Sequence, residues 1–286
     1  MASVLLAPAL VLFALLVVMP VVQAGYYSFF KWNGIGTADN FIGFGNFVKM
    51  FSHSVFRTAI ANNLKVVGIS LAVQLPLAFA MALLMGRSRV PGEVVFRSVY
   101  FFPYLLAEIV VGIIWKFIYH PQSGILTILS KILTDRGREI GILGDPNLAF
   151  AGIMAVIVWK YLGLHMIIYI AGLQGVSRDL EDAAVVDGAG PWQVVWHVII
   201  PGMRAAIAIS VFLSVIGSFN IFDVVWALGQ GGPVHSSETL VTYMYNFGFK
   251  RFAFGYGSAV ALVIFVLCLV FNILYQRFVV KGGNRG

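Results

Sequence analysis

Long apolar stretches that lack charged residues alternate with short polar segments along the whole chain. A helix rises about 1.5 Å per residue, so it needs ~20 residues to cross about 30 Å of hydrocarbon. Six stretches are long enough if one internal charge is allowed in the third and in the fourth. They are Val4 to Tyr26, the segment between Lys65 and Arg87, Ser98 to Tyr119, Leu148 to Leu173, the segment between Arg204 and Asp223, and the segment between Arg251 and Arg277. Because backbone groups in lipid must be bonded within their own segment, the pattern predicts an all-α integral membrane protein with six transmembrane helices in one domain, residues 1–286.

The composition agrees with a chain that lies in a lipid bilayer. Apolar residues make up 60% of it and charged residues 11%, whereas a soluble domain carries roughly 25% charged residues. The formal net charge is +7, but the basic residues are scattered and form no stripe. We therefore interpret them as anchors at the membrane boundary and do not expect nucleic-acid binding. The single cysteine, Cys268, lies in an apolar run and is expected to be a small buried side chain.

The first stretch has a second interpretation as a signal peptide, since Val22-Gln23-Ala24 resembles a cleavage site. Its apolar core is longer than the usual ~7–15 residues and no basic residue precedes it, so we expect a retained span. With six spans, both termini lie on one side of the membrane. Lys and Arg are equally numerous on the two sides, but the short loop 86–97 and the C-terminal tail are the denser basic clusters. This density favours cytoplasmic termini.

The loop from Ser177 to Pro201 has the pattern of two helices joined by a bend. Ser177 is a suitable N-cap, and the acidic residues that follow it suit the positive end of the helix dipole. Gly188 and Gly190 are expected to end this helix, and Pro191 suits the first turn of the next one. Pro201 is expected to end the second helix just before the fifth stretch.

Two interpretations of this loop follow from its residues. Ala183 and Ala184 are small enough to let another surface approach the backbone closely, and an acidic residue beside them can fix its orientation. This suits a rigid element that docks on a partner and transmits force. Trp192 and Trp196 lie on an apolar stripe, which equally suits an amphipathic helix on the membrane surface. The residue chemistry leaves both interpretations open.

The same loop resembles the EAA motif of binding-protein-dependent transport permeases, which reads E-A-A, three residues, G, nine residues, then I-x-L-P. Here the pattern is Asp182-Ala183-Ala184, Gly188 and Val198-Ile199-Ile200-Pro201, with conservative changes at three positions. The resemblance implies a cytoplasmic loop, residues 177–201, that fits a cleft on a separate ATPase. The residues it assigns to this coupling are Glu181, Asp182, Ala183, Ala184, Asp187, Gly188 and Pro201.

Further stretches are similar to the carbohydrate branch of that family, in particular to the core of the larger maltose permease subunit. They are Trp159 to Gly163, Ala171 to Gln174, Phe222 to Leu228, Gly231-Gly232-Pro233 and Ser237 to Ala259. The chain lacks that subunit's extra N-terminal spans and large periplasmic domain. The resemblance implies a type I ABC importer permease of the bacterial inner membrane that carries a sugar or oligosaccharide. It also implies a second related permease, two ATPase subunits that hold ATP and Mg, and an extracytoplasmic solute-binding protein.

Two charged residues lie deep inside predicted spans. Glu108 follows Arg97 by eleven residues, or ~16 Å along a helix, and Lys160 is similarly deep. A charge at the bilayer centre costs at least ~2.5–3.5 kcal/mol, so such residues usually face a pathway or a partner. We expect both to line a cavity and bind substrate hydroxyls; the alternative is that they pair with each other or with the partner subunit. Tyr104 precedes Glu108 by four residues and is expected on the same helical face.

The resemblance to the maltose subunit extends the candidate pathway. It implies substrate contacts at or beside Tyr104, Glu108, Lys160, Tyr161, Leu164, His165, Gly217, Ser218, Asn220 and Ile221. Glu108 occupies a position where that subunit has serine, and His165 on an apolar helix also suits a packing role. Glycines in the spans are expected to allow close helix packing, as at Gly68, Gly152 and Gly217.

The sequence contains no phosphate-binding G-x-x-x-x-G-K-[ST] loop, no His/Cys cluster with metal spacing and no nucleophile elbow. We therefore expect a non-catalytic subunit with no cofactor or metal of its own. One alternative is the same type of importer for glycerol phosphate, a polyol or an amino acid. Another is a stand-alone secondary transporter or channel with Glu108 and Lys160 as ion sites, which predicts inverted repeats that the sequence does not show.

Overall fold

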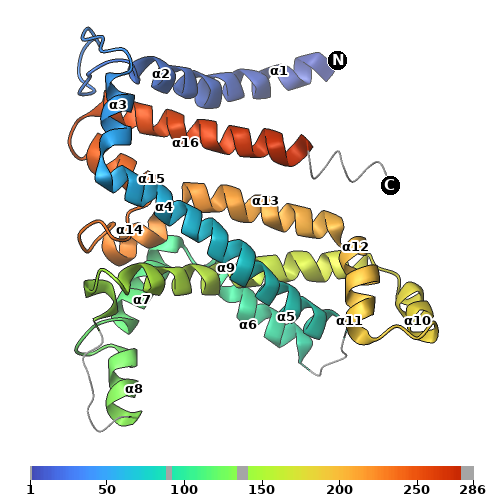
Figure 1. Cartoon of the computed structure of the whole chain (residues 1–286). Helices are drawn as coiled ribbons and strands as arrows, with labels where there is room; N and C mark the ends of the chain where they lie inside the picture. Colours follow the sequence, from blue (N-terminus) through green and yellow to red (C-terminus); the bar gives the residue numbers. More distant parts are fainter. Residues whose placement is uncertain (1, 88–91, 134–140, 278–286) are drawn as a thin grey trace.

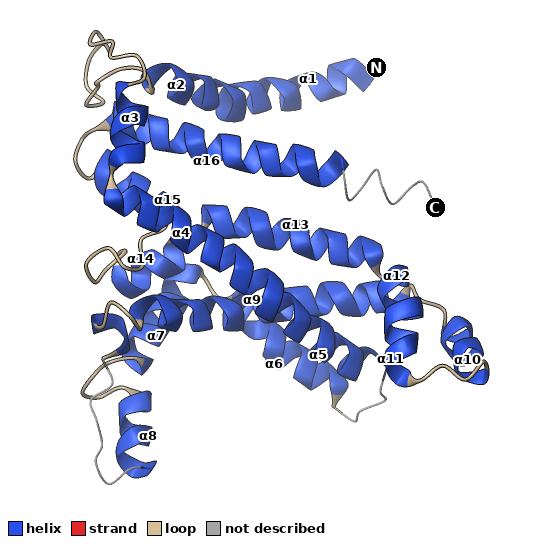
Figure 2. Ribbon diagram, in the orientation of Figure 1, coloured by secondary structure: helices blue, strands red, loops and turns tan. Residues whose placement is uncertain are grey.

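The computed structural model of the protein describes residues 2–87, 92–133 and 141–277. Most of these residues lie in helices, and the long helices run roughly along one direction (Figure 1 and Figure 2). The predicted all-α fold is confirmed for this part of the chain. Loop residues 88–91 and the tail 278–286, on which the expected orientation partly depends, lie outside the described residues.

Four helical segments are each long and apolar enough to cross a membrane, and they correspond to the predicted first, second, fourth and sixth spans. The second span begins at Ser54, earlier than predicted. Lys65 lies exposed on its surface with its ammonium 5.3 Å from the Phe150 ring centre, and therefore does not end it. The segments are α1 (Ala2–Phe13) with η1 (Ala14–Val18) and α2 (Met19–Tyr27); α4 (Ser54–Ile69) with η2 (Ser70–Gln74) and α5 (Leu75–Arg87); α9 (Ala149–Gln174); and α16 (Phe254–Tyr275).

The third span is bent, which the sequence did not indicate, whereas the predicted fifth span is the single helix α13 (Arg204–Asn220), with a bend just before it. Helix α6 (Glu93–Leu105) meets α7 (Glu108–Ile118) at an angle of 100°. Helix α13 meets the preceding helical run at 74°. That run consists of α11 (Pro191–Val194), η4 (Val195–Ile199) and α12 (Ile200–Gly202). The described residues thus contain six spans if each bent pair is counted as one.

Shorter elements occupy the two ends of the molecule (Figure 1). We call these the α10 end, where α10–α12 lie, and the α14 end, where α3, α14 and α15 lie. Helix α1 begins and α16 ends toward the α10 end. The remaining short elements are α3 (Gly45–Ser52), α8 (Ile125–Leu133), η3 (Ile142–Gly144), α10 (Arg178–Val186), α14 (Asp223–Gly229), α15 (Leu240–Met244) and η5 (Tyr245–Phe249).

Helix α9 is the central helix of the described fold and packs against α5, α6 and α13. Gly163 lets α6 approach it closely, because a Cβ built there would lie 2.1 Å from the Tyr100 carbonyl oxygen. Gly152 is also packed, with Ile142 at 2.5 Å from such a Cβ. Gly68 and Gly217 have no atom within 4 Å of a built Cβ, so the expectation of close packing at these two glycines is wrong within this chain.

Candidate functional site

A cavity of about 220 Å³ lies between the second, third, fourth and fifth spans. Its wall combines apolar side chains with hydroxyl, amide and imidazole groups. The lining residues are Val66, Ser70, Gln74, Tyr104, Ile157, Tyr161, Leu164, His165, Leu213, Ser214, Gly217, Ser218 and Ile221. The Nδ1 atom of His165 and the Oγ atom of Ser214 are buried without a hydrogen-bond partner among the described residues. The cavity wall therefore contains polar side chains whose hydrogen-bonding capacity is not fully used within the described residues.

Most of the candidate pathway residues border this cavity. Seven of the ten do so: Tyr104, Tyr161, Leu164, His165, Gly217, Ser218 and Ile221. Asn220 does not; it is exposed and donates a hydrogen bond to the Ile216 carbonyl at 2.9 Å. Ser70 and Gln74 also line the cavity but were not among the predicted pathway residues; they are buried on the second span, with their side-chain oxygens 3.5 Å apart. Their signal was present as two polar residues four positions apart in an apolar segment.

Glu108 lies beside the cavity and accepts a hydrogen bond from the Tyr161 hydroxyl. The rings of Tyr161 and Tyr104 are 6.1 Å apart between centres and meet edge to face. The expectation that Tyr104 and Glu108 share one helical face is wrong, because the helix is broken between them; each of them instead contacts Tyr161 on α9.

Lys160 is 2% exposed and is not part of the cavity wall. Its ammonium donates to the carbonyls of Leu106 at 2.7 Å, Pro103 at 3.4 Å and Tyr104 at 3.5 Å. Among the ion pairs of the described residues, none joins Lys160 to Glu108. The Lys160 side chain, which was expected to bind substrate, is therefore hydrogen-bonded to the end of α6.

Residues 177–201 form two helices joined by a bend, as predicted. The Ser177 hydroxyl oxygen accepts a hydrogen bond from the Asp179 backbone N–H at 3.2 Å, which caps α10. Gly188 follows the helix with φ of +89°, a left-handed conformation that favours glycine. The second helix ends within one residue of Pro201, as expected, because the helical run stops at Gly202 and α13 begins at Arg204.

The surface of this segment, which we call the docking segment, has two different faces. One face carries a hollow of about 310 Å³ lined by Ala184, Asp187, Gly188, Ala189, Gln193, His197 and Val198. Asp182 and Ala183 are exposed on α10. The other face carries Trp192 and Trp196, 76% and 63% exposed, over a groove of apolar residues from α5 and α13. The two interpretations of this loop, a docking element and an amphipathic helix on the membrane surface, therefore correspond to two faces of one segment.

Among the candidate coupling residues, Glu181 has a charged partner within the chain. It forms an ion pair with Arg87, the last residue of α5. Arg87 also donates to the Val176 carbonyl at 3.1 Å. The pair therefore ties the docking segment to the second span.

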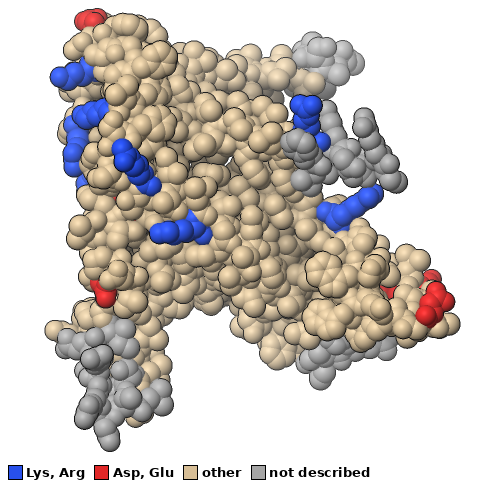
Figure 3. All heavy atoms as spheres, viewed as in Figure 1, with Lys and Arg blue, Asp and Glu red and all other residues tan. Residues whose placement is uncertain are grey.

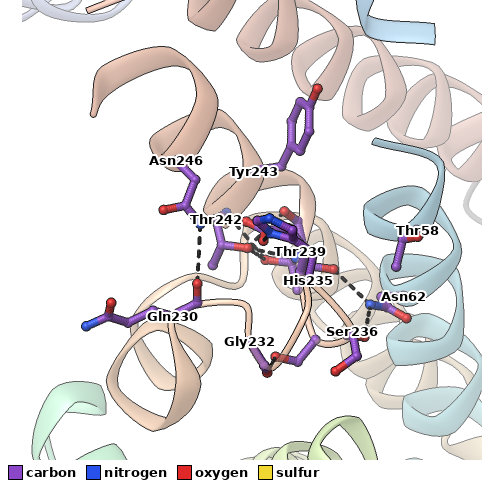
Figure 4. Close-up of polar contacts among 12 residues, drawn as sticks. Thr58, Asn62, Gln230, Gly232, His235, Ser236, Thr239, Thr242, Tyr243 and Asn246 are labelled. Atoms are coloured by element: carbon purple, nitrogen blue, oxygen red, sulfur yellow. Dashed lines mark hydrogen bonds and ion pairs between the residues drawn. The ribbon is translucent and has the colours of Figure 1, made fainter. Parts of the chain in front are cut away.

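The loop between α14 and α15 lies at the α14 end (Figure 1) and is held by a network of polar contacts (Figure 4). The Glu238 carboxylate is fully buried and contacts His235 Nδ1 at 2.7 Å and Asn246 Nδ2 at 2.8 Å. Asn62 on α4 donates to the carbonyls of Ser236 and Glu238 at 2.8 and 2.9 Å. Gly231 has φ of +88°, and a Cβ there would lie 2.4 Å from the Glu238 carboxylate. Hydrogen bonds therefore join the loop both to itself and to α4.

Basic side chains surround a hollow of about 460 Å³ beside this loop. Lys250 and Arg251 are exposed there and lie over the rings of Trp226 and Phe247, at 5.0 and 4.1 Å from the ring centres. Burial, followed by the positive charge of Arg251, lowers the pKa of His53, which borders the same region. Figure 3 shows several basic side chains and a few acidic ones over this end, and acidic side chains over α10 with basic ones nearby at the other end.

The sequence of residues 74–281 matches the family described as "Binding-protein-dependent transport system inner membrane component". This match covers more than half of the chain. The chain belongs to this family. Within the described residues, no group of three or more His, Cys, Asp or Glu side chains is arranged to hold a metal ion.

Several curated permeases are similar to this permease over nearly its whole length. A diacetylchitobiose uptake system permease of Streptomyces coelicolor is 32% identical over 97% of this chain and 82% of its own. An sn-glycerol-3-phosphate transport system permease of Agrobacterium fabrum is 30% identical over 99% of this chain and 95% of its own. A solved bacterial ABC transporter involved in the import of the acidic polysaccharide alginate contains a chain with a TM-score of 0.83 and 22% identity, covering 96% of this permease and 95% of that chain. This last likeness establishes the shared fold.

Proposed function

We propose that this permease carries a sugar or oligosaccharide as one subunit of an ATP-driven importer. The cavity carries the proposal: Tyr104 and Tyr161 place aromatic rings beside buried hydroxyl, amide and imidazole groups. Rings suit the C–H faces of a sugar, and the polar groups suit its hydroxyls. The described wall contains no Lys or Arg, which a phosphorylated substrate favours. This difference supports a sugar over glycerol phosphate, although relatives named for each exist.

The remaining components of the importer follow from surfaces that this chain leaves uncovered. A second permease subunit would pack against the first span, because the apolar part of that span has no buried residues within this chain. Two ATPase subunits, with ATP and Mg, would engage the docking segment on the cytoplasmic side, which is also the side of both termini. A solute-binding protein would deliver substrate at the α14 end. ATP-driven closure of the ATPases would then move the docking segment and open the cavity to each side in turn.

Reconstituted transport tests this proposal. The permease is co-expressed with the products of its neighbouring genes, purified by a tag, and placed in vesicles with ATP and a panel of labelled sugars. We expect an ATPase to co-purify and uptake to require both ATP and the binding protein. Uptake by the permease alone in ATP-free vesicles would identify a secondary transporter and contradict the proposal.

Charge reversal at the α14 end is expected to weaken the response to the solute-binding protein. Lys250→Glu combined with Arg251→Glu places acidic groups where an acidic partner surface would dock. Each exposed charge contributes ~1 kcal/mol or less, so uptake at limiting binding protein should fall about tenfold and recover at high binding-protein concentration. Lys116→Glu, an exposed charge on α7, is the matched control. Equal uptake by the double variant and the control would exclude this docking surface.

Charge reversal at Arg87 is expected to uncouple transport from ATP hydrolysis. Because Arg87 ties α10 to α5 through Glu181, Arg87→Glu should reduce the sugar transported per ATP about fivefold, as loss of a ~1 kcal/mol partly buried pair implies. The double variant Arg87→Glu with Glu181→Arg should recover most of the loss. Arg97→Glu removes an ion pair that lies within α6, with Glu93, and serves as control. A deficit of equal size in the control would show that the pair has no special role in coupling.

A further inference from the structure

The break in the third span lies against two consecutive residues of α9. Helix α6 ends at Leu105, α7 begins at Glu108, and Leu106 and Ala107 between them have extended backbone. The last carbonyls of a helix have no partner within that helix. In lipid, an unsatisfied backbone group costs several kcal/mol, so such a break requires donors from elsewhere in the protein.

Lys160 supplies donors to the end of α6. Its three carbonyl contacts equal the number of protons that an ammonium group can donate. A positive charge at this end of a helix is also favoured by the helix dipole. The ammonium further lies 5.9 Å from the Tyr104 ring centre and 5.5 Å from that of Tyr161. A cation bonded in this way has no donor left for a substrate.

Tyr161 holds the other side of the same break. Its hydroxyl donates to the carboxylate of Glu108, which lies in the first turn of α7, where the dipole favours negative charge. Lys160 therefore fixes the end of α6, and its neighbour fixes the start of α7. Both Tyr104 and Tyr161 line the cavity. The angle of the break and the shape of the cavity wall thus depend on the same pair of α9 residues.

We propose that Lys160 is a positioning residue that, together with Tyr161, sets the bend of the third span and so places Tyr104 in the substrate pathway. It acts through the α6 carbonyls and does not bind the substrate. The transport part of this inference rests on the proposed sugar-importer function. Its structural part concerns the bend alone and is tested separately.

Thiol labelling tests the bend without any substrate or ATPase. Val111 on α7 is 0% exposed, so in a Cys268→Ser background Val111→Cys should be protected from a membrane-permeant thiol reagent. Lys160→Met removes the hydrogen-bond donors but keeps a side chain of similar length. It should raise the labelling rate of Val111→Cys at least about tenfold, the factor that corresponds to ~1.4 kcal/mol. Tyr161→Phe should act in the same direction, and Lys160→Arg should restore protection. Lys116→Met, also a loss of one positive charge, should leave the rate unchanged.

Transport by the assembled importer gives the second readout. For Lys160→Met we expect sugar transported per ATP to fall about tenfold while the yield of assembled complex stays normal, and we expect rescue by Lys160→Arg. Continued protection of Val111→Cys in both Lys160→Met and Tyr161→Phe would overturn the inference. If the wild-type complex transports no sugar, the proposed function fails, and the labelling experiment still decides the role of Lys160.

Discussion

Replacing Gly188 with Asp is expected to remove the ATPase from the purified complex while the permease itself remains folded in the membrane. Gly188 lies at the bend of the docking segment, in the wall of its exposed hollow, with φ of +89°. A non-glycine residue in this conformation costs ~1–2 kcal/mol, and the new carboxylate would lie beside Asp187. Central residues of an interface contribute 2 kcal/mol or more, so retained ATPase and ATP-dependent uptake should fall about 30-fold.

Gly36→Asp is the matched control for this variant. Gly36 also has positive φ, +68°, and, like Gly188, has no atom within 4 Å of a built Cβ. It is exposed in the loop before α3, away from the docking segment. Backbone strain and added charge are therefore similar in the two variants, and only the location differs. Co-purification of normal amounts of ATPase with Gly188→Asp would contradict the assignment of residues 177–201 as the coupling segment.

Local rules predicted the docking segment well because its structure is decided locally. The Ser177 cap, the left-handed Gly188 and the first-turn Pro191 each act through neighbouring residues. Pro201 also marks the end of its helix locally, because the helical run that contains it stops at Gly202, one residue further on.

The break of the third span could not be predicted from apolar patterning. Hydrophobicity shows that a segment prefers lipid and does not show whether its helix is continuous. The break is stabilised by Lys160, which is 54 residues from Leu106 in the chain. Its only local signs were Pro103 and the charge of Glu108. A lysine and an acid inside neighbouring spans indicated a functional region, and only the three-dimensional structure shows that Lys160 bonds one side of the break while Glu108, on the other side, is bonded by Tyr161.

The cavity was predicted only in part, because the resemblance that supplied most of its residues did not cover every span that lines it. The resemblance to the maltose subunit supplied positions on the fourth and fifth spans, and seven of the ten candidates border the cavity. It supplied none on the second span, so Ser70 and Gln74 were missed. Helical spacing could have identified them, because both are buried polar residues on the face of the second span that meets α9 and α13.

Removal of the Glu108 carboxylate is expected to be the most damaging single change at the cavity. Glu108→Ala deletes the acceptor of the Tyr161 hydroxyl, which is then left partly buried without a partner at the cavity wall. The loss of a charged acceptor costs about 2 kcal/mol, so uptake at saturating binding protein should fall about 30-fold with normal assembly. Unchanged sugar uptake by Glu108→Ala would contradict the placement of this residue beside the pathway.

Glu108→Gln separates the hydrogen bond from the charge, because glutamine keeps an acceptor for Tyr161 and loses the proton-binding group. If the residue shapes the wall of a sugar pathway, this variant should retain most of the uptake that Glu108→Ala loses. If Glu108 were the proton site of a secondary transporter, both variants should lose all uptake driven by a pH gradient. Glu93→Ala, which removes the acidic partner of Arg97 on α6, controls for loss of an acid from the same span. The rank order of the three variants therefore distinguishes a wall-shaping hydrogen bond from an ion site, even before the transported sugar is known.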